Sequence, residues 1–179
     1  MTPEEVLDFW FGQLKPAQWF IADSALDADV GRRFATTHTE LQLGVADIWS
    51  ASARGTLAAV IVLDQFPRNM FRGTPKAFAT DAAALALSRS AIERQFDRSL
   101  ATIERQFLYM PFQHAEDLAT QAQSVALFEL LGDARVIDYA RRHHAVIERF
   151  GRFPHRNEIV GRVSTAEEIE FLKQPGSSF

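Results

Sequence analysis

A run of seven apolar residues from Leu57 to Leu63 places the strongest constraint on the fold of this chain. A segment with no polar residue has no side that can be exposed to water at low cost, so other parts of the protein must cover it on every side. Its centre, Val60-Ile61-Val62, is β-branched and would also suit a buried strand, because periodicity does not separate the two in so short a run. No other segment alternates as a partner strand would. We therefore predict a buried helix that Pro67 ends.

Helical spacing of apolar residues recurs along the rest of the chain. Thr2, Pro3 and Glu5 have the order of an N-cap, a first-turn proline and a capping box, so the chain should begin with a helix. A longer helix is expected at 27–50, with Val45, Ile48 and Trp49 on its buried face. Further helices are expected at 81–95, around 103–108, at 114–131 after an interruption by Pro111, at 134–150, and over a last short stretch ending near 172.

This pattern predicts an all-α fold of about seven helices, arranged as stacked antiparallel pairs because several helices are apolar on more than one side. At 179 residues the chain is expected to form a single helical domain over 1–179, with 174–179 as a loosely held tail. We expect the following side chains to be almost fully buried: Trp10, Phe11, Leu57, Ile61, Leu63, Leu108, Phe128 and Ile147.

Charge and composition narrow the possible partners. The net charge of −4 argues against nucleic-acid binding through bulk electrostatics. The longest apolar run is seven residues, whereas a membrane span needs roughly 20. The start of the chain has no basic segment followed by a long apolar stretch, so we expect no signal peptide and a cytoplasmic location. There is no cysteine, which excludes disulfides and thiolate metal sites.

Two similar corners contain the most distinctive polar residues. In the first, the buried run leads into Asp64-Gln65-Phe66-Pro67-Arg68-Asn69, with Arg72 close behind. The second is Phe153-Pro154-His155-Arg156-Asn157, followed by Arg162. Both combine a Phe-Pro step with an Arg-Asn pair. Each corner could be structural, with Asp64 accepting from Arg68 and Asn69 capping carbonyls freed by Pro67.

The alternative is an anion clamp, because a guanidinium forms bidentate bonds to carboxylates and phosphates. The segment 141–162 supports it with six arginines against two glutamates. If the clamp is shared, the two corners should lie against each other. The predicted ligand-binding residues are Gln65, Arg68, Asn69, Arg72, Arg156, Asn157 and Arg162.

Histidines and carboxylates provide candidates for acid–base chemistry. His114 and His155 could act as general bases, assisted by Asp64 or Glu116. His143 lies on an apolar helix face and is expected to be a hydrogen-bonded core residue. No pair has a diagnostic metal spacing, so no metal or other cofactor is predicted. The remaining N-terminal acids are expected to be capping and surface groups: Glu5, Asp8, Asp23, Asp27 and Asp29.

Several blocks resemble a bacterial family known as domain of unknown function 924. These are Val6 to Gly12, Trp19-Phe20, Leu63 to Asn69, Phe71 to Thr74, Ala77 to Asp81, Phe107 to Phe112, His114 to Glu116, Phe150 to Asn157, Gly161-Arg162 and Ser164-Thr165. The resemblance covers essentially the whole chain. It implies a helical fold similar to tetratricopeptide-repeat stacks and implies no activity.

Two interpretations of function follow. One is a binding protein for a small anionic ligand or a peptide carboxylate, held by the Arg and Asn groups of the two corners. The other is a hydrolase or lyase acting on a small anionic substrate through His, Asp and Glu. The variety of polar groups favours the enzyme, and the lack of a recognisable nucleophile or metal pattern favours the binding protein. The chain is expected to have neither nucleic acid nor membrane as a partner.

Overall fold

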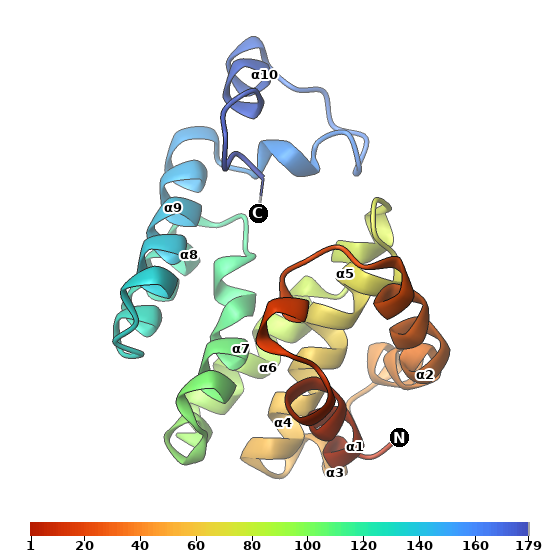
Figure 1. Ribbon diagram of the computed structural model, residues 1–179. Helices are drawn as coiled ribbons and strands as arrows, with labels where there is room; N and C mark the ends of the chain where they lie inside the picture. Colours follow the sequence, from red (N-terminus) through yellow and green to blue (C-terminus); the bar gives the residue numbers. More distant parts are fainter. Residues whose placement is uncertain (179) are drawn as a thin grey trace. The chain divides into compact units, whose positions relative to one another are not determined.

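The computed structural model describes residues 1–178 and contains helices and loops, with no strand among those residues (Figure 1). The prediction of an all-α fold is confirmed. The chain divides into two compact units. Unit 1 comprises residues 1–72 and 76–111, and unit 2 comprises residues 73–75 and the chain from 112 onward. That the two form a single domain stays a prediction.

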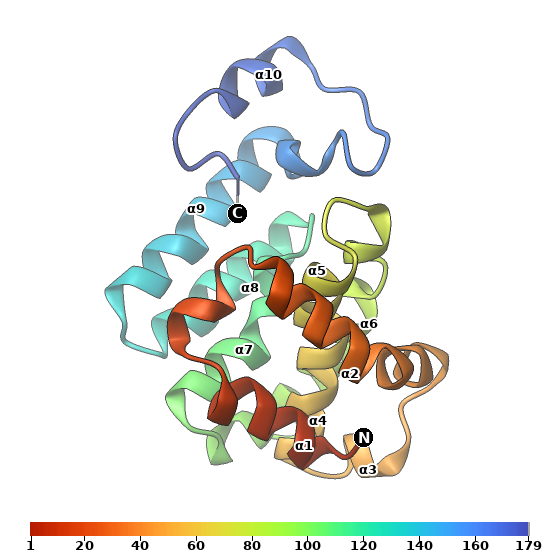
Figure 2. The ribbon, with the colours of Figure 1, turned by 45° about the vertical axis from the view of Figure 1, so that its right-hand side comes forward.

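Unit 1 is organised around its buried central helix. Its helices are α1 (Pro3–Leu7), α2 (Ser24–Leu43), α3 (Asp47–Ser50), α4 (Ala53–Val60), α5 (Phe66–Met70), α6 (Asp81–Glu93) and most of α7 (Thr102–Gln113). Helix α4 contacts α1, α3 and α6, and α2 packs against α5, as can be followed in Figure 2. Every residue from Leu57 to Leu63 has zero exposure, which confirms the buried helix.

The prediction that Pro67 ends this helix is wrong. After α4 the backbone continues through a π-helical turn, Ile61–Gln65, directly into α5. Pro67 occupies the first turn of α5, and its missing N–H leaves one carbonyl of the preceding turn without its usual donor. In a regular α-helix the residue at position 67 would donate to the Leu63 carbonyl. That carbonyl instead accepts a hydrogen bond from Thr80 Oγ1 at 2.6 Å.

Replacing Thr80 with valine should therefore lower the free energy of unfolding by about 1–3 kcal/mol, because it leaves the buried Leu63 carbonyl unsatisfied. Valine keeps the shape of threonine, so the cavity term is small. Thr39→Val is the matched control, since Thr39 is exposed and its hydroxyl donates to the Ala35 carbonyl within the same helix. Urea unfolding followed by tryptophan fluorescence measures both changes. Equal losses in the two variants would show that Thr80 does not support the π-helical turn.

Two other helix boundaries differ from the prediction. The helix expected at 27–50 is two helices, α2 and α3, because Gly44 takes an extended backbone and stops the first. As a result Ile48 is 61% exposed instead of buried. Helix α7 continues through Pro111 to Gln113, and the next helix does not begin at His114. Asp117 accepts the Thr120 N–H at 2.7 Å and so fixes a later start.

Unit 2 contains α8 (Leu118–Glu129), α9 (Ala134–Phe150) and α10 (Ala166–Leu172). Helices α8 and α9 pack against each other across a short turn, as an antiparallel pair (Figure 1). Helix α9 ends at Phe150, and the next residue, Gly151, has a φ of +68°, which residues other than glycine rarely adopt. A hydrophobic cluster of Val146, Ile147 and Phe153 forms the core of this unit.

The predicted core residues are buried, with one exception. Phe11 is only partly buried, because it lies in a second π-helical turn, Asp8–Gln13, and packs its ring against Trp19 and Phe107 near the surface. In this turn too, a backbone carbonyl accepts a hydrogen bond from a side chain: Trp19 Nε1 donates to the Trp10 carbonyl at 2.8 Å.

The C-terminal residues contact the rest of unit 2 up to Ser177. Ser177 is buried and donates its hydroxyl hydrogen to the Leu172 carbonyl at 3.1 Å. Phe179, the last residue of the predicted tail, lies outside the described residues. None of the helices within 1–178 is both long and apolar enough to cross a membrane. The cytoplasmic location stays a prediction.

Candidate functional site

The π-helical turn places the first corner at the end of the buried helix. Asp64 is completely buried, and its Oδ2 accepts a hydrogen bond from Gln65 Nε2 at 2.5 Å. Arg68 donates to Asp81 through both terminal nitrogens, at 3.0 and 3.1 Å. Arg68 Nη1 also lies 3.5 Å from Asp64 Oδ1 and donates to the Asp64 carbonyl. Arg68 is thus held between two carboxylates of unit 1.

Asn69 and Arg72 share a third carboxylate, Asp27. Asn69 Nδ2 donates to Asp27 Oδ1 at 2.8 Å, so it does not cap a carbonyl freed by Pro67. Arg72 donates to the same carboxylate through Nε at 2.7 Å and Nη2 at 2.8 Å. The hydrogen bond from Arg72 is the main reason why the pKa of Asp27 lies below its ordinary value. Sequence reasoning treated Asp27 as a surface group and missed this role.

His38 is a further member of this corner that the sequence did not reveal. Its Nε2 lies 3.4 Å from Thr80 Oγ1, whose hydrogen is directed to the Leu63 carbonyl. Nε2 must therefore carry a proton and act as the donor. Burial lowers the pKa of His38, so the ring is neutral at neutral pH. No sequence spacing links residues 38, 63 and 80.

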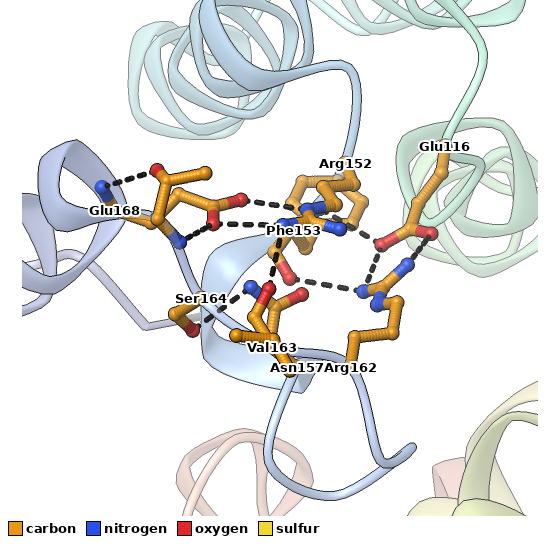
Figure 3. Close-up of polar contacts among 9 residues, drawn as sticks. Glu116, Arg152, Phe153, Asn157, Arg162, Val163, Ser164 and Glu168 are labelled. Atoms are coloured by element: carbon orange, nitrogen blue, oxygen red, sulfur yellow. Dashed lines mark hydrogen bonds and ion pairs between the residues drawn. The ribbon is translucent and has the colours of Figure 1, made fainter.

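The second corner is fixed by Glu116, which precedes α8 (Figure 3). Glu116 accepts the Phe153 backbone N–H at 2.8 Å and two bonds from Arg162, at 2.6 and 2.9 Å. Burial raises the pKa of Glu116, but the Arg162 and Phe153 bonds and the nearby Arg156 charge outweigh it, and the pKa is lowered. Glu116 is therefore an ionised carboxylate in a bidentate pair.

A second carboxylate, that of Glu168, binds Arg152, the residue before Phe153. Arg152 donates to it through Nε at 2.6 Å and Nη2 at 2.8 Å, and the Thr165 N–H adds a bond at 2.7 Å. Figure 3 shows the two carboxylates on either side of the chain at residues 152–153. The Arg152 bonds are the main cause that lowers the pKa of Glu168 to about 2.

Arg156, His155 and Asn157 form the centre of this corner. Arg156 is 8% exposed, and its guanidinium carbon lies 4.6 Å from the centre of the Phe153 ring. Burial, and then the charge of Arg156, lower the pKa of His155 to about 4. Asn157 is fully buried and donates from Nδ2 to Ser164 Oγ at 3.0 Å.

His143 and His114 differ in their surroundings. Burial lowers the pKa of His143 to about 3, and its Nδ1 lies 2.8 Å from the Tyr139 carbonyl. This agrees with the prediction of a hydrogen-bonded core residue. His114 is half-buried and lies in the connection between α7 and α8, outside both helices.

The positive excess of segment 141–162 is largely neutralised in space. Four of its arginines pair with glutamates that lie outside the segment. These pairs are Arg141 with Glu129, Arg149 with Glu167, Arg152 with Glu168, and Arg162 with Glu116. A count of charges along the sequence therefore overstates the positive potential of this region.

Comparisons with known proteins were consistent with the residue pattern. Residues 6–176 match the family described as bacterial protein of unknown function, DUF924. The chain belongs to this family. A solved structure, that of a protein of unknown function, ATU0120 from Agrobacterium tumefaciens, is 39% identical, covers 96% of both chains and has a TM-score of 0.88. No curated protein matches the chain.

In this DUF924 protein the two predicted corners belong to different units: 64–72 to unit 1, and 153–162 to unit 2. Their meeting stays a prediction, as does a ligand role for the predicted site residues. Within each corner the structure does bring predicted residues together: Asp64 with Gln65 and Arg68, and Glu116 with Arg162. No group of three or more His, Cys, Asp or Glu side chains within 1–178 has the geometry to hold a metal ion.

Proposed function

We propose that the second corner binds a small anion, a carboxylate or phosphate group, with the Arg156 guanidinium as its principal contact. The observation that carries this proposal is a guanidinium that is only 8% exposed and lies over the Phe153 ring. Burial is the main cause that lowers the pKa of His143 and His155, and the Arg156 charge lowers both further. For Glu116 the Arg156 charge adds to the Arg162 and Phe153 bonds that lower its pKa. A buried cation that favours the deprotonated form of three neighbours provides the positive potential that an anion needs.

The other predicted arginines contribute less to this proposal. Arg68, Arg72 and Arg162 each form a bidentate pair with a carboxylate of their own unit. An anion would have to compete with those pairs.

The Arg156 guanidinium carbon lies 4.6 Å from the centre of the Phe153 ring, which helps to fix the plane of its fork and reduces the entropy lost when a ligand binds.

The experiment is a thermal unfolding series with phosphate, sulfate and acetate at constant ionic strength. An anion at about ten times its Kd stabilises the folded state by about 1.4 kcal/mol, which raises the Tm of a protein of this size by roughly 3–6 °C. Arg156→Lys should abolish that rise, because charge is kept but the planar fork is lost. It should leave the Tm without anions almost unchanged.

Arg135→Lys is the control, since Arg135 lies on the same helix-rich unit with 91% of its side chain exposed. It should respond to anions as the natural protein does. If no anion raises the Tm, and Arg156→Lys alone unfolds the protein, the corner is a structural clasp and the binding proposal fails.

A hydrolase or lyase is the second candidate, because a neutral imidazole, His155, lies beside the Arg156 cation. At a pKa of about 4 the imidazole is deprotonated at neutral pH and can accept a proton. It is a weak base for that role, which favours binding over catalysis. A turnover rate that rises as the pH passes through about 4 and disappears in His155→Gln would support the enzyme instead.

A further inference from the structure

Unit 1, which lies wholly within the described residues, contains a single histidine, His38. It belongs to α2 and is 5% exposed, with its ring centre 5.7 Å from that of Phe71, which follows α5. Its Nε2 lies 3.4 Å from Thr80 Oγ1 and donates to it, and the Thr80 hydroxyl donates to the Leu63 carbonyl. One imidazole thus connects α2 to the π-helical turn through one buried hydroxyl.

The hydroxyl in this connection belongs to the residue that precedes α6. Thr80 is the N-cap of that helix, and a threonine at this position commonly accepts an N–H of the first turn. The Thr80 side chain makes no such bond. Its oxygen accepts from His38 instead. When His38 is withdrawn, the oxygen can accept from the first turn of α6, so the hydroxyl has a partner in either arrangement.

The imidazole has no counter-ion. Within residues 1–178 its hydrogen-bond partner is the Thr80 hydroxyl, and no carboxylate pairs with it. The charged side chains on the elements around it are Asp27 and Glu40 of α2, Asp64 of the π-helical turn, Arg68 of α5, Arg72 and Lys76 beyond α5, and Asp81 of α6. Arg68 lies between Asp64 and Asp81. Arg72 is paired with Asp27. Burial lowers the pKa of His38, because a second proton would create a buried charge with no partner.

The end of α2 (38–43) is attached to unit 1 by few side chains. Of its residues only His38 and Leu41 are buried, and the chain just beyond it, 44–46, is not helical. The earlier part of α2 is held independently, because Val30 and Phe34 have no exposed surface. The end of α2 can therefore open locally by exposing one leucine and one histidine, while the rest of the unit stays folded.

We propose that His38 is an acid-sensitive switch: a second proton on its ring detaches the end of α2 from Thr80 and loosens the π-helical turn that carries Asp64 and Gln65. The detached imidazole has the ordinary histidine pKa of 6.5, and the attached imidazole has a lower pKa. The attached form is therefore fully favoured above about pH 6.5 and is progressively lost as the pH falls below that value. The switch belongs to unit 1 and uses no residue of the anion site proposed above.

Amide hydrogen exchange at about pH 7 and about pH 5 tests the switch. Protection factors are compared, because they correct for the pH dependence of intrinsic exchange. Those of residues 41–43 should fall at least about threefold between the two pH values, because a larger fraction of the protein is then detached. At both pH values the amides of 57–60 should stay better protected, which shows that the end of α2 opens without global unfolding.

His38→Gln is the decisive variant. A glutamine amide places a neutral N–H donor near the position of Nε2 and cannot take a second proton. The variant should keep the protection of 41–43 at about pH 7 and should show no fall at about pH 5. His144→Gln is the matched control, since His144 is half-buried on α9 in unit 2. It should respond to pH as the natural protein does.

An NMR titration of the histidine rings in the natural protein gives a second readout that does not depend on any variant folding. The His38 ring should titrate with a midpoint below 6.5, and a midpoint at or above that value overturns the switch. The switch is also overturned if the protection of 41–43 is the same at both pH values, or if His38→Gln loses as much protection as the natural protein. Equal protection at 41–43 and 57–60 would contradict it too, because acid would then unfold unit 1 as a whole.

Discussion

Phe66→Ala should lower the free energy of unfolding by about 3–5 kcal/mol, one of the largest losses expected from a single substitution in this protein. The Phe66 ring has no exposed surface and lies at the centre of an aromatic cluster. Its centre is 4.5 Å from that of Phe34, 5.6 Å from that of Trp10 and 6.0 Å from that of Phe9. Alanine removes all three contacts and leaves a cavity that rigid helices on several sides have little freedom to close.

The matched control is Phe20→Ala. Phe20 is also part of an aromatic contact, with its ring stacked 6.2 Å from that of Phe107, but 60% of the residue is exposed. Its loss should cost about 1 kcal/mol or less. All three tryptophans, at 10, 19 and 49, lie in unit 1, so fluorescence during urea unfolding reports on both variants. Similar losses would mean that Phe66 is not at the centre of the unit 1 core.

The sequence was sufficient to predict that the chain is helical, but not to predict where one helix ends and where it continues into the next. The apolar run at 57–63 needs cover on every side, and it is buried throughout. Pro67 and Pro111 were expected to stop helices, and neither does. A proline removes one N–H and its ring crowds the carbonyl four residues earlier, so its effect depends on how the backbone makes room and on what satisfies that carbonyl. At Leu63 that partner is Thr80, 17 positions away, and no local pattern shows it.

The same limit applies to the polar corners. Asp64 and Arg68 are four residues apart on continuous helical backbone, so their proximity could be predicted from spacing. Glu116 and Arg162 are separated by 46 positions, and Asn69 and Asp27 by 42. Such pairs depend on how helices pack. Sequence reasoning therefore identified the arginines but could not assign the carboxylates that hold them.

Glu168→Gln should lower the free energy of unfolding by about 3 kcal/mol at neutral pH, the low end of the range for breaking a buried ion pair. Glu168 is 2% exposed, whereas 29% of its partner Arg152 is exposed, which moderates the loss. Glutamine at this third helical position still completes a capping box, so the substitution removes the charge and keeps the cap of α10. Far-UV circular dichroism is the suitable probe, because unit 2 contains no tryptophan.

The pH dependence of the free energy of unfolding distinguishes the contribution of the Glu168 charge from that of its side-chain packing. The folded-state pKa of Glu168 is about 2, below its ordinary 4.5, so its stabilisation is complete above the ordinary value and is lost as the pH falls towards 2. The difference between the natural protein and Glu168→Gln should be constant from about pH 6 to 8 and should shrink steadily below about pH 4.5. Glu170→Gln, with 70% of the Glu170 side chain exposed beside Lys173, should cost less than about 0.5 kcal/mol at any pH. A Glu168→Gln loss that stays constant down to about pH 2 would mean that shape, and not the bond to Arg152, explains the conformation of residues 152–168.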